Sequence, residues 1–196
     1  MPRPIEFDRT QALNDAMLLF WRQGYHNTSV RDLTDATRLK PGSLYGAFSS
    51  KRTLFLKSLD FYSEALRAAV DGMLHNDRSP LERIEYFFNR LMEETERDPQ
   101  QKGCLLVNTL LETPFEDREI TKKASEGLIY VEKTFAELLE EARRNGELPS
   151  LGNTEAQARV LMSAIFGLRV YARMHPAPGT LASITTTILD NLRKAN

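Results

Sequence analysis

Apolar residues recur at helical spacing along almost the whole chain. The first such stretch begins after the capping residue Asp8 and ends before Gly24, and its apolar face comprises Ala12, Leu13, Ala16, Met17 and Phe20. No segment shows the strict apolar–polar alternation of a half-buried strand. The pattern therefore predicts an all-α protein of about nine helices.

Capping signals set the boundaries of the other predicted helices. Ser29 followed by Asp32 resembles a capping box that opens a second helix, which is expected to end near Thr37. Pro41 suits the first position of a third helix, expected to end near Phe48. The remaining helices are expected at about 50–73, 80–98, 104–111, 117–145, 155–174 and 180–193.

The second and third helices are short and are separated by a sharp break. The segment Lys40-Pro41-Gly42 cannot continue one helix into the next, because proline lacks the backbone N–H that a helix interior requires. Two short helices joined by a tight turn form a helix-turn-helix, whose second helix enters the major groove of DNA. Gly42 is expected to let the backbone approach a phosphate closely.

The charge of the chain is unevenly distributed. The net charge is −1, but residues 1–60 hold nine Lys and Arg against six Asp and Glu, whereas the remainder holds 17 against 21. A basic head on an acidic body favours a polyanionic partner for the N-terminal part. A single cysteine, no signal-like apolar run and no apolar stretch of about 18 residues predict a cytoplasmic, soluble protein.

Three features of the N-terminal part carry a family resemblance. They are Thr28-Ser29-Val30, the segment 39-LKPGSLYGAF-48, and Lys51 at the start of a long helix. Over roughly residues 7–62 the chain resembles the DNA-binding head of the TetR/AcrR family of transcriptional repressors. The resemblance implies a homodimer that binds a palindromic operator and releases it when a small molecule occupies the body. The expected domains are 6–66, with the helix-turn-helix at about 29–48, and 67–196.

The resemblance also implies which residues contact DNA. Thr28, Ser29, the Tyr45 hydroxyl and Lys51 are expected to meet phosphates, whereas base reading is expected from the turn and the third helix. The full implied set is Thr28, Ser29, Arg38, Lys40, Gly42, Ser43, Tyr45 and Lys51. Many members carry a polar ring after the tyrosine, but this chain has Gly46-Ala47, so few long side chains are available to read bases. The apolar residues expected to hold the motif together are Leu33, Leu39, Leu44 and Phe48.

The body offers candidates for a ligand pocket and for a dimer interface. Its middle helices combine aromatic, methionine and polar residues, which suit an apolar or aromatic effector but equally an ordinary core. The pocket candidates are Phe88, Leu91, Met92, Cys104, Leu106, Leu110, Tyr130 and Phe135. The last two helices carry apolar stripes that suit either the intramolecular core or a four-helix dimer seam. The dimer candidates are Leu161, Ile165, Phe166, Gly167, Ile184, Ile188 and Leu192.

Cys104 has two interpretations. It follows Lys102-Gly103 at the start of a predicted helix, and a helix N-terminus beside a cation stabilises a thiolate, so the residue is a candidate sensor of electrophiles or oxidants. The alternative is a small buried apolar residue, which is what a free cysteine usually is.

No catalytic constellation is visible in the sequence. The three histidines are scattered, no glycine-rich phosphate loop is present, and no catalytic triad can be argued. The sequence therefore predicts a regulator that is not an enzyme and needs no metal or cofactor. The alternative is a helical small-molecule-binding protein or enzyme whose head does not bind DNA.

Overall fold

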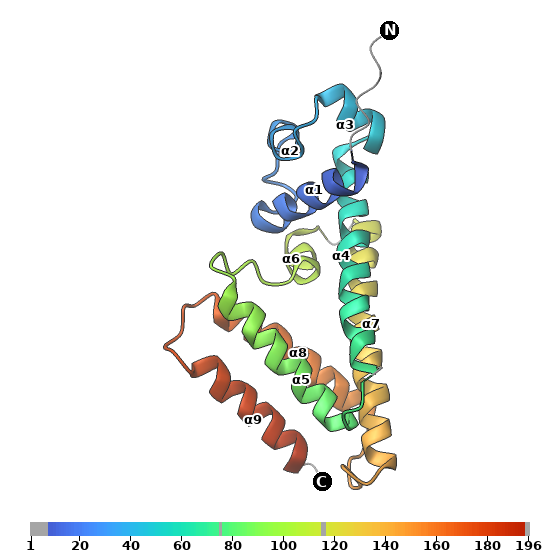
Figure 1. Cartoon of the computed structure of the whole chain (residues 1–196), viewed down its shortest axis with the longest axis vertical. Helices are drawn as coiled ribbons and strands as arrows, with labels where there is room; N and C mark the ends of the chain where they lie inside the picture. The colour runs from blue at the N-terminus through green and yellow to red at the C-terminus, as the bar shows by residue number, and fades with distance from the viewer. Residues whose placement is uncertain (1–7, 75, 115–116, 195–196) are drawn as a thin grey trace. The chain divides into compact units, whose positions relative to one another are not determined.

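The structure is a computed structural model that describes residues 8–74, 76–114 and 117–194. These residues form helices and no strand, which confirms the all-α prediction (Figure 1). The helices of the described part are α1 (Arg9–Gln23), α2 (Val30–Thr37), α3 (Pro41–Phe48), α4 (Lys51–Leu74), α5 (Pro80–Arg97), α6 (Leu105–Glu112), α7 (Arg118–Arg144), α8 (Thr154–Ala172) and α9 (Thr180–Lys194).

The chain divides into two compact units, and α4 and α7 each contribute to both. Unit 1 comprises Met1–Ala65 with Cys104–Ser125, and unit 2 comprises Leu66–Gly103 with Glu126–Asn196. The first boundary lies one residue from the one expected from sequence, but α6 and the start of α7 group with the head. The outer ends of the expected domains, residues 6–7 and 195–196, lie outside the described residues.

In unit 1 the predicted local signals fix the helix ends. The Asp8 carboxylate accepts the backbone N–H groups of Thr10 and Gln11 and so caps α1. Ser29 and Asp32 form the predicted capping box at α2. Of the four apolar residues expected to hold the motif together, Leu33, Leu44 and Phe48 are buried and Leu39 is half-buried.

The long helices of unit 1 are also joined by ion pairs. Arg52 near the start of α4 bonds both Asp117, which precedes α7, at 2.9 Å and Glu119 at 2.5 Å. One turn further along, Lys123 lies 2.5 Å from Asp60. These pairs hold the beginning of α7 against α4 within the same unit as the helix-turn-helix.

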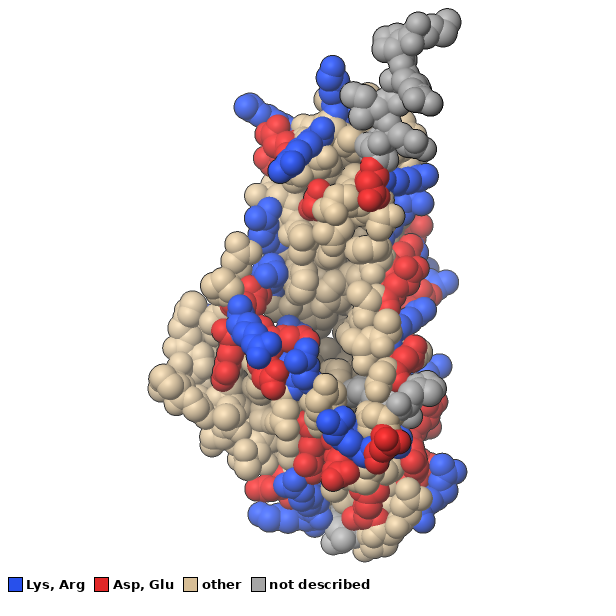
Figure 2. All heavy atoms as spheres, viewed as in Figure 1, with Lys and Arg blue, Asp and Glu red and all other residues tan. Residues whose placement is uncertain are grey.

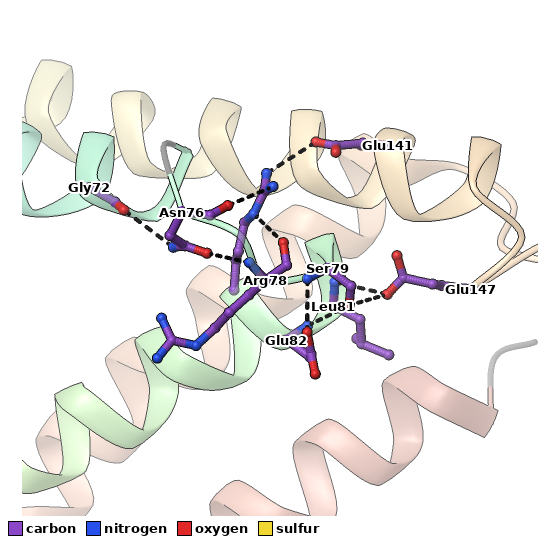
Figure 3. A network of polar contacts seen from close by, with 9 residues as sticks. Gly72, Asn76, Arg78, Ser79, Leu81, Glu82, Glu141 and Glu147 are labelled. Atoms are coloured by element: carbon purple, nitrogen blue, oxygen red, sulfur yellow. Dashed lines mark hydrogen bonds and ion pairs between the residues drawn. The ribbon is translucent and has the colours of Figure 1, made fainter.

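In unit 2, α5, α8 and α9 lie side by side and share an apolar core with the second part of α7 (Figure 1). A polar network closes one end of this unit (Figure 3). Ser79 donates to the Glu147 carboxylate at 2.7 Å, and the Glu82 carboxylate accepts the Ser79 N–H at 2.8 Å. Arg83 donates to the backbone oxygens of Asn76 and Arg78. The start of α5 is thereby fixed to the segment that follows α7.

Candidate nucleic-acid interface

The turn between α2 and α3 presents its polar residues to solvent. Arg38 ends α2 in the left-handed conformation with a φ of 57°, which takes the chain out of the helix. Lys40 then precedes Pro41, the first residue of α3, as predicted. Arg38, Lys40, Gly42, Ser43 and Tyr45 are all exposed, whereas Leu44 and Phe48 on the opposite face are buried. The helix therefore separates an anchoring face from a free polar face.

The free face of α3 has little side-chain bulk. A Cβ atom added at Gly42 or at Gly46 would meet no other atom within 4 Å. These two glycines lie one helical turn apart and flank the exposed Tyr45 ring. The surface of α3 is consequently bare backbone at two positions, which permits a close approach to a groove of DNA.

Lys51 is held in place by an aromatic side chain. Its ammonium group lies 4.5 Å from the centroid of the Tyr25 ring, and that ring packs 4.7 Å from the ring of Phe55. Burial lowers the pKa of the Lys51 ammonium, while the Asp32 carboxylate acts in the opposite direction. The cation is thus positioned beside α2 and at the first residue of α4.

The two hydroxyl residues before α2 have different environments. Ser29 is exposed, and its hydroxyl and backbone N–H both bond the Asp32 carboxylate, which lowers the pKa of Asp32. Thr28 is 1% exposed and its hydroxyl donates to the Gly24 carbonyl at 2.6 Å. The expectation that the Thr28 side chain meets a phosphate is therefore corrected, because its only hydroxyl is buried and engaged within unit 1.

Sequence reasoning missed three residues that support this surface. Arg9 donates to the Ala47 carbonyl at the end of α3 at 2.7 Å and lies over the Phe48 ring. Glu112 accepts the backbone N–H of Tyr25 at 3.2 Å. Arg9, Tyr25 and Glu112 contact residues far away in sequence, so neither spacing nor composition indicates their roles. Figure 2 shows Lys and Arg side chains projecting at the end of unit 1 that carries α2 and α3.

The predicted pocket residues are divided between the two units. Phe88, Leu91, Met92 and Phe135 are buried in the packed core of unit 2, with Tyr130 at its edge. The Tyr130 hydroxyl bonds Asp71, and this raises the pKa of Tyr130. Cys104, Leu106 and Leu110 belong to unit 1. Aromatic and apolar side chains at helical spacing serve a core as readily as a pocket, and here four of them are core.

Cys104 lies at the N-terminal end of α6, as predicted, and is largely buried. The Tyr62 hydroxyl donates to its sulfur at 3.7 Å. The neighbouring cation that the sequence analysis invoked is engaged elsewhere, because the Lys102 ammonium pairs with Asp98 at 2.7 Å. Of the two expected features, Cys104 therefore has the helix terminus, and the Lys102 ammonium is engaged by Asp98.

The expected dimer residues fall into two groups. Leu161, Ile165 and Leu192 are buried in the core of unit 2, so for these three the intramolecular alternative holds rather than the dimer seam. An apolar stripe marks a buried face but does not reveal whether the covering surface belongs to the same chain. Phe166, Ile184 and Ile188 are half-buried, and Gly167 is exposed with no atom within 4 Å of an added Cβ. A second, exposed stripe on α8 and just beyond it comprises Val160, Gly167, Val170, Tyr171 and Met174.

Comparison with known proteins follows the division into head and body. Residues 12–57 match the family model of bacterial regulatory proteins of the tetR family, and residues 80–188 match that of the tetracyclin repressor-like C-terminal domain. The HTH-type transcriptional repressor ComR of Escherichia coli K12 is 30% identical over 95% of this chain and 90% of its own length. The uncharacterized HTH-type transcriptional regulator YezE of Bacillus subtilis 168 is 32% identical over 76% of each chain.

A solved structure extends the similarity to a complex with DNA. It contains a cysteine mutant of the TetR family transcriptional regulator CifR bound to 26-base-pair double-strand operator DNA. It is 28% identical to this chain, covers 96% of it and 98% of its own length, and superposes with a TM-score of 0.85. Among the described residues, no helix is long and apolar enough to cross a membrane, and no cluster of His, Cys, Asp or Glu suits a metal ion.

Proposed function

Because the chain belongs to the tetR family of bacterial regulatory proteins, we propose that it represses transcription by binding a palindromic operator through α2, α3 and the start of α4. The observation that carries this proposal is the exposed polar face of α3, whose opposite face is anchored by Leu44 and Phe48. The curated relatives are transcription regulators rather than enzymes, so they give no support to a catalytic alternative.

The proposed contacts divide into those that position the head and those that read bases. Tyr45 and Lys51 bond phosphates, because each is a donor at the edge of the motif, whereas the hydroxyl and the backbone N–H of Ser29 already bond Asp32. Lys40 and Ser43 reach base edges from the start of α3, and Arg38 does so from the turn. The bare backbone at Gly42 and Gly46 lets α3 sit deep enough for these short side chains to reach.

A two-fold dimer is the second part of the proposal. An operator with two half-sites about 34 Å apart requires two heads related by symmetry. The exposed stripe of Val160, Gly167, Val170, Tyr171 and Met174, with the half-buried Ile184 and Ile188 of α9, supports a four-helix seam. Gly167 allows two α8 helices to approach closely, because nothing occupies the space beside its Cα.

Release of the operator is the third part of the proposal. A small-molecule effector binds the C-terminal body and favours a conformation in which the two heads no longer match the half-sites. The effector must bind that conformation better than the DNA-bound one, since equal affinity shifts nothing. The protein acts in the cytoplasm, where bacterial operator DNA lies.

A second candidate concerns the type of effector. The position of Cys104 at the start of α6 and the Tyr62 hydroxyl on its sulfur make this residue the candidate for reaction with an electrophile or oxidant. Cys104→Ser tests this route. If the variant still releases the operator on treatment with hydrogen peroxide or N-ethylmaleimide as wild type does, the cysteine is not the sensor.

The central experiment measures binding to the DNA upstream of the protein's own coding region by fluorescence anisotropy over a salt series. We expect affinity to fall steeply with salt, because phosphate contacts release counterions. Tyr45→Phe and Lys51→Ala each lose about 1–2 kcal/mol of binding free energy, and Lys51→Ala reduces the salt slope by about one. Tyr86→Phe on α5 is the matched control, since Tyr86 and Tyr45 are both 39% exposed. Unchanged affinity in both head variants contradicts the assignment.

A further inference from the structure

Unit 2 contains a cavity of about 250 Å³ that none of the expected pocket residues lines. It lies between the C-terminal end of α5, the segment after it, and the connection from α8 to α9. Its walls are Thr95, Glu96, Gln101, Ala172, His175, Leu181 and the residues 176–179. The volume suits a small organic molecule rather than a single water.

The backbone around this cavity is strained at two positions. Gln101 has a φ of 44° and His175 a φ of 50°, and they are two of only four non-glycine residues with positive φ in the described chain. Such conformations persist only where the surroundings enforce them, and they concentrate at ligand sites.

Named contacts enforce both conformations. The Gln101 N–H donates to the Asp98 carbonyl at 3.0 Å, and the His175 N–H donates to the Ala172 carbonyl at 3.1 Å. The Asp98 carboxylate in turn accepts the backbone N–H groups of Gln100 and Lys102. These hydrogen bonds fix the backbone of both loops, and Gln101 and His175 both line the cavity.

The wall of the cavity contains a polar group without a partner. The side-chain oxygen of Gln101 is buried and accepts no hydrogen bond from any described residue. Buried acceptors in folded proteins almost always have a donor, so an arrangement that gives this oxygen an N–H or O–H partner is favoured. Gln101 lines the cavity, but this oxygen has no surface open to it, so a bound molecule can pair with it only if the end of the side chain turns towards the cavity.

The charged residues around the cavity indicate whether a bound molecule would be a cation or an anion. Glu96 is the only Asp, Glu, Lys or Arg among the lining residues, so the cavity presents one carboxylate and no lysine or arginine. Other parts of the wall are apolar, from Ala172, Pro176, Ala177, Pro178 and Leu181. An anionic ligand would face Glu96 without compensation, whereas a cation gains from it.

We propose that this cavity binds a small organic cation, a primary amine with a hydrocarbon part. The ammonium group donates to the Glu96 carboxylate and to the side-chain oxygen of Gln101. The hydrocarbon part packs against Pro178 and Leu181. This site is separate from the operator-binding proposal, and its occupation can be measured without DNA.

The test uses phenethylamine as the probe and 2-phenylethanol as its neutral counterpart of nearly equal shape. Isothermal titration calorimetry on the full chain is expected to show binding of the amine and at least about fivefold weaker binding of the alcohol. Glu96→Gln reduces the amine affinity about fivefold and leaves the alcohol affinity unchanged. Glu94→Gln is the matched control, because Glu94 is an exposed glutamate of the same helix outside the cavity.

The position of the probe is read from amide chemical shifts in ¹⁵N-labelled protein. The expected shifts fall on the Gln101 side-chain amide and on the backbone of Gly179. Ala177→Leu, which fills the cavity from an exposed position, is expected to abolish them. Equal affinities for amine and alcohol, an unchanged amine affinity in Glu96→Gln, or shifts confined to other residues would each overturn the proposal.

Discussion

The carboxylate of Glu112, the last residue of α6, accepts the backbone N–H of Tyr25, just beyond the end of α1, at 3.2 Å. Gly24 makes this contact possible: its φ is 81°, and a Cβ there would lie 2.3 Å from a Glu112 carboxylate oxygen. The Tyr25 ring in turn supports the Lys51 ammonium. Within unit 1, α6 is thus connected through one turn to a residue proposed to bind phosphate.

Removal of this carboxylate is expected to weaken both the head and its DNA binding. Glu112→Ala should lower the free energy of unfolding by about 1 kcal/mol, since a hydrogen bond to a charged but exposed acceptor is lost. Operator affinity should fall as well, because Tyr25 positions Lys51. Urea denaturation followed by circular dichroism gives the first quantity and anisotropy the second. Glu64→Ala, an exposed glutamate of unit 1, serves as the control.

A double-mutant cycle separates the contact from general destabilisation. Gly24→Ala should cost more than about 1 kcal/mol, because alanine is strained at positive φ and displaces the Glu112 carboxylate. Once Gly24→Ala has displaced that carboxylate, Glu112→Ala should cost little more. The double variant should therefore lose less stability than the sum of the losses of the two single variants. Strict additivity would show that the two residues do not interact.

The glycine in the middle of α3 should affect stability and DNA binding in opposite directions. Gly46→Ala should raise the free energy of unfolding by up to about 1 kcal/mol, because alanine favours a helix and no atom lies within 4 Å of the new Cβ. The same methyl group should weaken operator binding by holding α3 away from the groove. Gly72→Ala in α4 is the matched control, since its added Cβ also meets nothing. Equal operator affinity for both variants would refute close approach at position 46.

The exposed stripe of α8 should be required for dimerisation. Val170→Arg should raise the dissociation constant of the dimer at least about 30-fold, because it introduces a charge into an apolar seam. This corresponds to about 2 kcal/mol, the contribution of an important interface residue. Light scattering after size-exclusion chromatography gives the mass over a dilution series. Ile129→Arg on α7 is the control, since Ile129 is similarly exposed but lies off the stripe. A dimer that persists in Val170→Arg at the same dilution argues for another interface.

The start of α2 should become less stable in acid. The hydroxyl and then the backbone N–H of Ser29 lower the pKa of Asp32 from its ordinary value of 3.8. A lowered folded pKa contributes stability that is present above 3.8 and is lost as pH falls through the folded value. Asp32→Asn should therefore be less stable than wild type at neutral pH, with a difference that shrinks below about pH 4. Asp35→Asn, the same change at an exposed position of the same helix, is the matched control.

The sequence alone determined the helices and the DNA-binding motif, because both rest on local interactions. Ser29 with Asp32, and Pro41, act within one helical turn, so their positions in the chain suffice to predict where α2 and α3 begin. The spacing of Leu44, Tyr45 and Phe48 likewise fixed which face of α3 is anchored and which is free.

Only the tertiary structure decided which side chains are exposed and free to contact a partner. Leu161 and Val170 are both apolar residues of α8, yet the first is buried and the second exposed, because neighbouring helices cover one face of α8 and not the other. Thr28 is polar and adjacent to Ser29, yet its hydroxyl is buried and donates to the Gly24 carbonyl. The contact of Glu112 with Tyr25 spans 87 residues, and no local pattern can predict a contact that packing alone creates.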